Sequence, residues 1–401
     1  MAATNLAIGN AQDGSTSSPP AGLTTVLVIG AGLIGTSVAL AISRQGVKVH
    51  LRDTDPSAAL TAQALGAGTV EQPRGPVDLA VVAVPPAQMA TELAAAQAAG
   101  AARAYTDVSS VKEAVEQASS DAGCDMSSYL GGHPMAGRER SGPWAAKPGL
   151  FEGRPWIITP TRATSAVTER SVRELIALCG AVPVVMAADA HDRAMALVSH
   201  TPHLISALTA ARLEHLGQTE MMLVGQGLQD VVRISGGDPR LWADILVSNA
   251  GAVAGVLGEI ALDLQRVTSA LLAVASSCPS MLAQAWEEAT VSLLDILGRG
   301  RAGHDRLPGK HGSPRQPFAE VHVVVGDNSG ALARLLADVS AAGVNVEDIV
   351  LDHAMGTPSG TVSLQVSSAA SATLPEALQA LGWEAYGPLT ELHRRNGGHH
   401  Q

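Results

Sequence analysis

A glycine-rich turn between a short apolar run and a helical pattern constrains this chain most. The segment "TTVLVIGAGLIGTSVALAIS" places β-branched apolar residues before Gly30, Gly32 and Gly35 and an amphipathic helix pattern after them. Gly30 permits the tight turn, Gly32 lets the backbone approach a pyrophosphate, and Gly35 lets the helix pack closely on the sheet. The N–H groups at the helix start, around Leu33 and Ile34, then face the anion. This pattern predicts a dinucleotide-binding turn.

An acidic residue at the end of the next predicted strand refines that prediction. The strand "VKVHLRD" ends at Asp53, at the distance that the glycine fingerprint requires. A carboxylate there accepts hydrogen bonds from the adenine ribose and repels a 2'-phosphate. The sequence therefore predicts NAD rather than NADP as the cofactor, although Arg52 stands beside Asp53. The alternative is a glycine turn in another α/β fold, where this full context is uncommon.

The order of the remaining patterns predicts the domains. Strands alternate with helices over residues 23–186, which indicates a Rossmann-type NAD-binding domain with a parallel sheet covered on both faces. Residues 1–22 are polar and predict a disordered tail without the features of a secretory signal. The fold class is therefore α/β at the start of the chain.

Residues 187–298 read as long apolar helices without a convincing strand. We expect an all-helical dimerisation and substrate domain, part of whose surface is buried against a second copy in a homodimer. The most apolar stretch, 267–286, is interrupted by Ser, Cys and Pro. A buried helical segment is therefore a better interpretation of it than a membrane span.

The last part of the chain follows a different pattern. Residues 299–317 are rich in Gly, Pro and basic residues, which is typical of a linker. Over residues 318–390 the patterns come in the order βαββαβ, which predicts a ferredoxin-like domain.

Composition excludes several classes of function. The net charge of −11 argues against general nucleic-acid binding, which requires clustered Lys and Arg. The three cysteines lack metal-binding spacing, and their odd number favours reduced thiols in the cytoplasm. No metal, nucleic-acid partner or membrane is expected.

His133 is the residue that most directly suggests chemistry. It lies in "GGHPMAGRERSG", where flanking glycines and Pro134 predict a loop at the sheet edge where such folds bind ligands. A neutral imidazole there could accept a proton at physiological pH. The alternative is a loop histidine that caps a backbone carbonyl.

Five segments together resemble the prephenate dehydrogenase family: "VIGAGLIGTSVALAI", "DVSSVK", "GGHPMAGRERSG", "SHTPH" and "DVVRISGGDPRLW". They appear in the family's order, the resemblance covers about residues 24–300, and the third and fifth segments are the most specific. The C-terminal region resembles an ACT domain, a small-molecule sensing module. Its loop "GDNSG" has Asn328 and Ser329 where that family more often has Arg-Pro.

The resemblance implies an NAD-dependent oxidative decarboxylation of a cyclohexadienol. Prephenate would give 4-hydroxyphenylpyruvate in tyrosine biosynthesis, and arogenate would give tyrosine. His133 would accept the hydroxyl proton, and Ser110 would hydrogen-bond both the hydroxyl and His133. Ser109 or Ser110 could instead cap the following helix.

The resemblance also implies a substrate pocket. Arg233 would bind a substrate carboxylate, His203 and Ser199 would line the side-chain pocket, and Trp242 would lie near the site. A solvated arginine and core packing of Trp242 are the alternatives. His200 and His203 are three residues apart, so a metal pair is a further, weaker alternative.

Other positions are implied with departures from the family pattern. Glu139 and Asp192 would form an ionic gate at the pocket mouth, although ordinary surface charges are equally compatible. Arg138 stands where the family often has Thr, and Gln229 stands where it often has Lys. The loss of that lysine keeps arogenate, with its ammonium group, as a candidate substrate.

Three alternatives to a prephenate dehydrogenase remain at this point. The enzyme could act on arogenate or on 4-amino-4-deoxyprephenate, or the chain could be a catalytically silent sensor of NAD or amino acids. An aromatic amino acid, tyrosine first, is the expected effector at the ACT-like domain.

Overall fold

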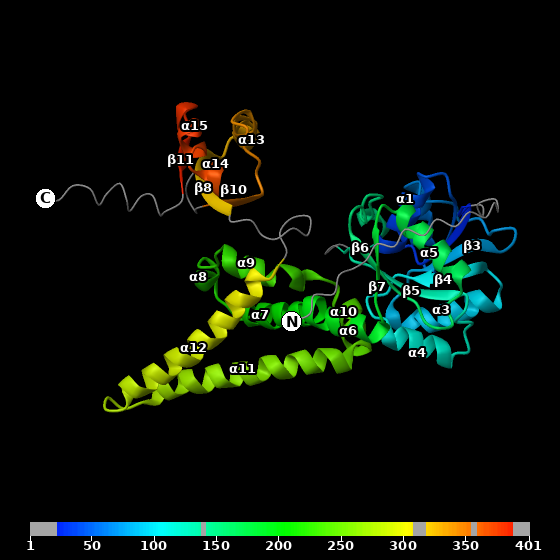
Figure 1. The fold of residues 1–401 in the computed structure, drawn as a ribbon, viewed down its shortest axis with the longest axis horizontal. Coiled ribbons are helices and arrows are strands. Elements are labelled where there is room, and N and C mark those ends of the chain that lie inside the picture. Colours follow the sequence, from blue (N-terminus) through cyan, green and yellow to red (C-terminus); the bar gives the residue numbers. More distant parts are fainter. Residues whose placement is uncertain (1–21, 138–141, 308–317, 354–358, 388–401) are drawn as a thin grey trace, which may run out of the picture. The chain divides into compact units, whose positions relative to one another are not determined.

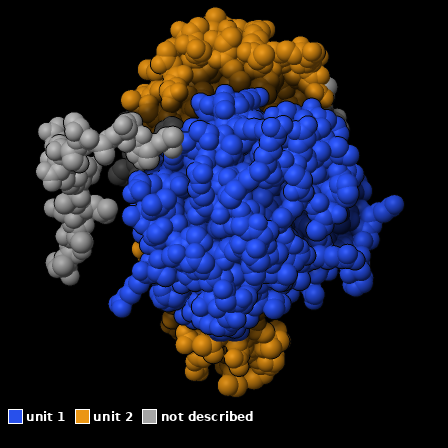
Figure 2. Space-filling view, turned by 90° about the vertical axis from the view of Figure 1, so that its right-hand side faces the viewer, with its two compact units in different colours: residues 1–261 blue, residues 262–401 orange. Residues whose placement is uncertain are grey.

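The computed structural model describes residues 22–137, 142–307, 318–353 and 359–387. The chain divides into two compact units, residues 1–261 and 262–401, which Figure 2 distinguishes by colour. The division falls inside one long helix, α11 (Ala250–Ser276). The first unit carries the predicted nucleotide turn and His133.

A seven-stranded sheet with the order β2-β1-β3-β4-β5-β6-β7 forms the centre of the first unit (Figure 1). Its strands are β1 (Thr25–Ile29), β2 (Lys48–Arg52), β3 (Val77–Val82), β4 (Ala102–Asp107), β5 (Tyr129–Pro134), β6 (Pro155–Thr159) and β7 (Val182–Val185). The helices that follow them are α1 (Leu33–Ser43), α2 (Pro56–Ala64), α3 (Pro86–Ala98), α4 (Glu113–Asp121) and α5 (Ala166–Leu178).

Alternate side chains of the strands supply two cores, one on each face of the sheet. Val26 and Val28 of β1 pack with α1 and α5, whereas Leu27 and Ile29 pack with α3 and α4. This period of two is the expected result for a sheet buried on both faces. The predicted α/β class is confirmed, with one difference: β6 pairs antiparallel with β5, so the sheet is mixed.

The prediction that His133 lies on a loop is wrong, because His133 belongs to β5 and pairs with Ile157 of β6. Gly131 and Gly132, which precede it, lie too close to neighbouring atoms to carry a side chain. A Cβ on Gly132 would lie 2.7 Å from the Asp107 carbonyl oxygen, and one on Gly131 would lie 2.5 Å from Thr159 Oγ1. Glycine in a strand commonly marks such a close approach.

Every element described from residue 188 to residue 305 is helical, as predicted. These elements are α6 (Ala188–Met195), a π-helical turn (Ala196–His200), α7 (Thr201–Ala210), a 3₁₀ turn (Ala211–Leu213), α8 (Gln218–Met221), α9 (Gln226–Val232), a 3₁₀ turn (Arg233–Gly236), α10 (Pro239–Ser248), α11 and α12 (Leu282–Asp305). Pi-helical turns inside helices are frequent at functional sites, and this one directly precedes α7.

The most apolar stretch does not form one buried helix. α11 ends at Ser276, α12 begins at Leu282, and Leu272 and Trp286 are exposed in the single chain. Within the described ranges, no single helix has the length and apolar character to cross a membrane. α10 and α11 pass that test only as a pair, and they meet at a 93° bend.

The predicted linker begins too early, because α12 continues through residues 299–305. Arg299 explains this locally: its guanidinium bonds Asp295 one turn earlier at 3.0 Å and Asp263 of α11 at 2.8 Å. Pairs at this spacing support a helix that contains several glycines. Residues 308–317 of the predicted linker lie outside the described part.

The C-terminal elements form a separate antiparallel sheet with the order β11-β8-β10-β9. They are β8 (Phe318–Gly326), α13 (Ala331–Ala341), β9 (Asp348–His353), β10 (Ser359–Ser367), α14 (Ser368–Ser371), α15 (Leu374–Ala380) and β11 (Glu384–Tyr386). Their own apolar core includes Val323, Leu335 and Leu364. The predicted ferredoxin-like βαββαβ fold is confirmed.

Candidate functional site

The turn between β1 and α1 has the shape of a phosphate cradle. Gly30 adopts φ +103°, and a Cβ there would lie 2.2 Å from the carbonyl oxygen of Ala83. A Cβ on Gly35 would lie 2.0 Å from the Gly30 oxygen, so only glycine fits at either position. Gly32 begins α1 without a side-chain cap, and the space beside it is open. The N–H groups of the first turn, including those of Leu33 and Ile34, are therefore available to an anion.

Asp53 is fixed at the rim of this cradle. Its Oδ2 accepts a hydrogen bond from the N–H of Ala31 at 2.6 Å, and its Oδ1 accepts one from the N–H of Asp55 at 2.8 Å. A cavity of about 400 Å³ lies between the cradle and the segment after β3, and Gly30, Gly32 and Asp53 line it. The residues present thus fit the adenosine and pyrophosphate parts of a dinucleotide.

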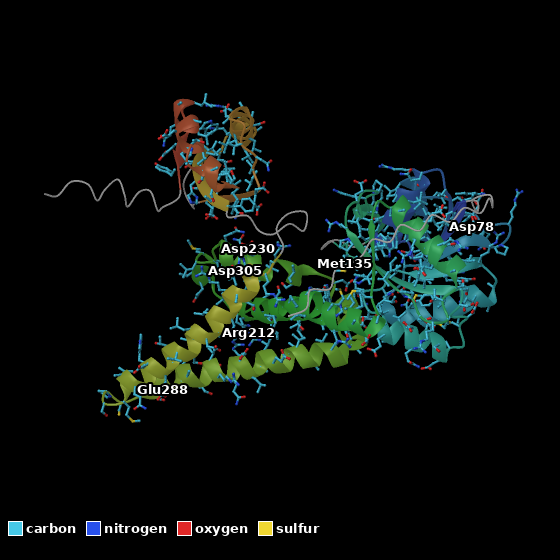
Figure 3. The ribbon with its side chains drawn as sticks, in the orientation of Figure 1. Asp78, Met135, Arg212, Asp230, Glu288 and Asp305 are labelled. Carbon is cyan, nitrogen blue, oxygen red and sulfur yellow. The ribbon has the colours of Figure 1, made fainter. Side chains whose placement is uncertain are left out.

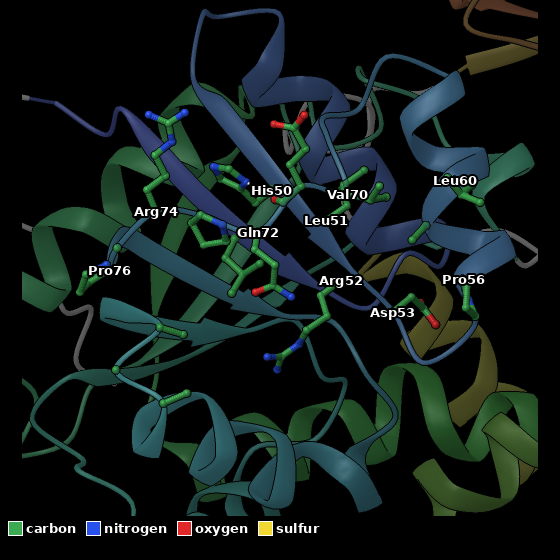
Figure 4. A pocket seen from close by; sticks show the side chains of 18 residues that line it. His50, Leu51, Arg52, Asp53, Pro56, Leu60, Val70, Gln72, Arg74 and Pro76 are labelled. Atoms are coloured by element: carbon green, nitrogen blue, oxygen red, sulfur yellow. Dashed lines mark hydrogen bonds between the residues drawn. The ribbon is translucent and has the colours of Figure 1, made fainter.

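Arg52 lines the same cavity but is neutralised by a partner. Its guanidinium forms an ion pair of 3.2 Å with Glu92 on α3. In Figure 4 the side chains of Arg52 and Asp53 point in different directions, although the residues are adjacent. Both also line a second cavity of about 840 Å³ beside β2, which lacks the glycine cradle. The smaller cavity is therefore the better nucleotide site.

His133, which is half-buried, is the first member of a chain of three hydrogen-bonded polar groups. Its Nδ1 lies 2.8 Å from Nε2 of His191, and Nδ1 of His191 lies 2.7 Å from Oδ1 of Asp192. His191 is fully buried and Asp192 is 3% exposed. Met135, labelled in Figure 3, directly follows β5 and marks the strand end beside His133.

Burial makes His133 a weak base that stays neutral. Loss of solvent lowers its pKa well below 6.5, and the charges of His191, Lys112 and His200 lower that pKa further. Burial also lowers the pKa of His200 to about 4. A neutral imidazole is the form that can accept a proton.

A buried ion pair lies beneath the end of β5. Lys112 Nζ donates hydrogen bonds to the Asp107 carboxylate and to the Gly132 carbonyl oxygen, and Lys112 is 1% exposed. Asp107 also accepts from the Tyr129 hydroxyl at 3.0 Å and from the N–H of Gly132 at 2.8 Å. The pair therefore ties the end of β4 to the backbone next to His133. Burial lowers the pKa of Lys112, and Asp107 opposes that shift.

Ser110 reaches the same edge of the sheet as His133. β4 and β5 are parallel neighbours, and Ser110 follows the end of β4 in a half-buried position. The alternative role as a helix cap is wrong for Ser109 and Ser110, because α4 begins after Lys112 without a side-chain cap from its own segment. Asp192 supplies the cap instead, accepting from the N–H groups of Lys112 at 2.8 Å and Glu113 at 2.9 Å.

A second group of predicted residues comes together around Trp242. The His203 ring stacks on the Trp242 ring at 3.5 Å, and the His200 ring meets its edge at 6.4 Å. A Cβ on Gly237 would lie 2.5 Å from Trp242 Nε1 and 3.2 Å from His203 Cε1, so the segment before α10 lies close to α7. Ser199 is half-buried in the π-helical turn that precedes α7. Among the described residues, no cluster of His, Cys, Asp and Glu is arranged to hold a metal ion.

The remaining predicted residues are less enclosed in the single chain. Arg233 begins the 3₁₀ turn after α9 and is exposed, as is Gln229. Ser206 of α7 bonds the Val231 carbonyl at 2.7 Å, which brings the segment of Arg233 against the helix that carries His203. Arg138 lies outside the described residues.

The interpretation of Asp192 as a gate charge at the pocket mouth is wrong for this residue. Its carboxylate is buried and bonds His191 and the start of α4, so it cannot stand at a pocket mouth as a solvated charge. Glu139, the other implied member, lies outside the described residues.

The sequence alone did not indicate the buried polar partners of the site, which are His191, Asp107, Lys112 and Asn249. Asn249 donates to the Asp192 carbonyl at 2.8 Å and lies 3.0 Å from His200 Nδ1. Asp107 and Lys112 are the two ends of the quoted segment "DVSSVK", and His191 directly precedes Asp192. Asp107 and Lys112 stand as a pair of opposite charges between an apolar strand and a helix. This pattern could have indicated a buried ion pair, since charged groups are rarely buried unless they are paired.

Comparison with known proteins gives a consistent result over residues 38–283. The family model for the prephenate dehydrogenase nucleotide-binding domain matches residues 38–185, and the model for the dimerization domain of the same family matches residues 187–283. A probable prephenate dehydrogenase, NovF of Streptomyces niveus, is 40% identical over 90% of this chain and 99% of its own length.

Solved structures agree with these matches. A putative prephenate dehydrogenase from Corynebacterium glutamicum is similar with a TM-score of 0.59 and 26% identity, covering 71% of this chain and 90% of its own. The prephenate dehydrogenase from A. aeolicus, solved with hydroxyphenyl propionate and NAD+, has a TM-score of 0.56 and 25% identity, covering 69% of this chain and 100% of its own. The chain with this nucleotide cradle and half-buried His133 belongs to the prephenate dehydrogenase family.

Proposed function

We propose that the protein catalyses the NAD-dependent oxidative decarboxylation of prephenate to 4-hydroxyphenylpyruvate, a step of tyrosine biosynthesis. The observation that carries this proposal is the half-buried His133 of β5, whose Nδ1 bonds His191 and whose pKa is lowered well below 6.5 by its surroundings. In the sheet, β5 is two strands from β3, which precedes the Ala83 loop beside the glycine cradle. The A. aeolicus relative holds NAD+ and an aromatic propionate, which is the ligand chemistry proposed here.

Each group has one task in this reaction. When bound, NAD would accept the hydride from the carbinol carbon. His133 would take the hydroxyl proton through Nε2 as the carbonyl forms. Loss of the ring carboxylate as carbon dioxide would leave its electron pair in the ring, which becomes aromatic, and the resulting phenolate oxygen would take the proton back from His133. Ser110 would hydrogen-bond the same hydroxyl, and Arg233 would hold a substrate carboxylate.

Absorbance of NADH with purified enzyme and each cyclohexadienol in turn tests the proposal. Turnover of prephenate above that of arogenate and 4-amino-4-deoxyprephenate is the expected result. A preference for arogenate is the second candidate, which the exposed Gln229 in place of a lysine favours. Absence of NADH formation with all three substrates would contradict the enzyme assignment and favour a sensor.

Cofactor choice should depend on Asp53. Replacing it with serine removes the carboxylate that repels a 2'-phosphate, so the preference of kcat/KM for NAD over NADP should narrow. Glu92→Gln is the matched variant: it leaves Asp53 in place but frees Arg52 from its ion pair, and it should also narrow the preference. A wild-type enzyme that prefers NADP would show that Arg52 governs the site.

Arg233→Ala should mainly weaken substrate binding. A charge-assisted pair with a carboxylate in a desolvated pocket contributes about 1.5–3 kcal/mol, which corresponds to a rise of roughly 10- to 150-fold in KM for prephenate. Arg240→Ala, which changes an exposed arginine on the next helix, is the control. A KM for Arg233→Ala within error of the wild type would exclude Arg233 as the carboxylate anchor.

We propose further that the enzyme is a cytoplasmic homodimer through its helical domain. The exposed apolar side chains of α11 and α12, including Leu272, Leu294 and Trp286, are the surface that a second copy would cover. The match of residues 187–283 to a dimerization domain supports this assembly.

The C-terminal βαββαβ fold is proposed as an ACT-like regulatory domain for an aromatic amino acid, tyrosine first. Truncation after Leu307 keeps α12 whole and should leave turnover intact while abolishing tyrosine inhibition that acts through this domain. Steady-state rates with and without tyrosine measure both effects. Inhibition that persists unchanged would place tyrosine in the active site as a product competitor.

A further inference from the structure

We propose that His191 and Asp192 are positioning residues that hold His133 in one tautomer, with its proton on Nδ1 and a bare Nε2 directed to the reaction. The inference rests on the proposed role of His133 as the base. The family resemblance implied no role for His191 and a role as a gate charge for Asp192.

The direction of each hydrogen bond follows from the chain of acceptors. Asp192 carries a carboxylate, which only accepts, so Nδ1 of His191 must donate to it across 2.7 Å. In a neutral His191 the other nitrogen, Nε2, is then an acceptor. His133 Nδ1 lies 2.8 Å from that acceptor and must donate. The remaining nitrogen of His133 therefore has a lone pair.

This arrangement matters because the opposite tautomer is the normal one. A neutral histidine in water prefers the proton on Nε2, and a base in that form has no lone pair where the substrate proton arrives. Fixing the reactive tautomer through the second nitrogen is a general device of catalytic histidines.

Asp192 is itself held by four groups from three segments. Its carboxylate accepts from the N–H groups of Lys112 and Glu113, and its carbonyl accepts from Asn249. The same side chain therefore fixes both the ring of His191 and the start of α4, directly after the loop that carries Ser110. One carboxylate thus aligns the two groups proposed to contact the substrate hydroxyl.

The charges around the pair determine how it responds to pH. His133 faces His191 and His200 from the helical segment and Lys112 from the loop before α4, and these groups add to the effect of burial in lowering the pKa of His133. Asp192 and Asp107 are the carboxylates next to His191 and Lys112. The pH profile therefore reflects several groups at once, so the tautomer of His133 is the readout that isolates the contribution of His191.

The direct test is the tautomer of His133 in full-length enzyme labelled with ¹⁵N-histidine. Long-range ¹H–¹⁵N spectra distinguish a protonated ring nitrogen from a bare one, and the His133→Asn variant assigns the signal. A protonated Nδ1 and a bare Nε2 on His133 are expected in the wild type. The proton on Nε2 in folded wild-type enzyme would overturn the proposal without any further variant.

His191→Leu and His191→Gln test the dependence on the partner. Leucine offers no acceptor, so His133 should change to the Nε2–H form and kcat should fall by about 10- to 100-fold, the usual cost of losing an orienting partner, with KM nearly unchanged. Glutamine places an amide oxygen within reach of His133 Nδ1 and should restore most of kcat.

Ser119→Ala is the matched control, because it removes the buried hydrogen bond from Ser119 Oγ to the Val115 carbonyl within α4 without touching the contacts of His133, His191 and Asp192. It should lower stability and leave the His133 tautomer and kcat unchanged. A His191→Leu enzyme with wild-type kcat and tautomer would overturn the positioning role. Wild-type turnover in His133→Asn would instead defeat the proposed base, whichever tautomer the spectra show.

Discussion

Replacing His133 with asparagine should lower kcat by about 100- to 10,000-fold, the range for loss of a positioned acid–base group. Asparagine keeps a polar side chain of similar size but cannot take the hydroxyl proton. NAD affinity should change little, because the glycine cradle and Asp53 lie on β1 and β2 rather than on β5. Turnover at saturating substrate and NAD titration by fluorescence measure the two effects.

The role of His133 as a base also predicts in which direction the activity changes with pH. His133 works as a base only when neutral, and its pKa lies well below 6.5. The acid limb of kcat/KM in the wild type should therefore lie below that of an ordinary histidine, with activity kept at mildly acidic pH and lost as the pH falls through the lowered pKa. His322→Asn, in the C-terminal sheet, is the control and should keep wild-type turnover. A His133→Asn enzyme as fast as the wild type would end the assignment.

Lys112→Met should produce the largest loss of stability, about 3–5 kcal/mol in the free energy of unfolding, the usual cost of removing one partner from a buried ion pair. The change leaves the Asp107 carboxylate fully buried without its cation and removes the hydrogen bond from Lys112 to the Gly132 carbonyl. Because Gly132 adjoins His133, the remaining folded enzyme should also turn over more slowly.

Urea unfolding of the two enzymes, followed by circular dichroism, measures this loss. Lys48→Met is the matched control, since Lys48 is exposed at the start of β2, and it should stay within about 0.5 kcal/mol of the wild type. Equal stability of Lys112→Met and the wild type would mean that the pair contributes nothing beyond what its desolvation costs.

The parts of the fold that depend on local backbone chemistry were predictable. Gly30 and Gly35 occur where any Cβ would collide with backbone atoms, so the presence of glycine at these two positions is enough to predict the turn. The alternation of strands and helices and the βαββαβ order follow from the period of two and from helix patterns within short windows. His133 was recognisable as the candidate base because its segment is polar and specific to a family.

Other predictions failed where local composition has more than one cause. Gly131 and Gly132 suggested a loop, but they make room for Thr159 and Asp107 inside a strand. Residues 299–305 suggested a linker, but Arg299 bonds α11 and continues the helix. In both cases a neighbour distant in sequence decides the conformation.

The sequence by itself determined the nucleotide turn, Asp53 at the end of β2, the helical character of the middle of the chain and the presence of His133. Only the tertiary structure decided the hydrogen-bond and ion-pair partners of these groups. His191 is 58 residues from His133 in the sequence, and Glu92 is 40 residues from Arg52. The residue that caps the start of α4 at Lys112 is 80 positions away. A glycine turn is a property of a few consecutive residues, whereas a hydrogen-bonded chain of polar groups exists only after separate elements pack and bring its donors and acceptors together.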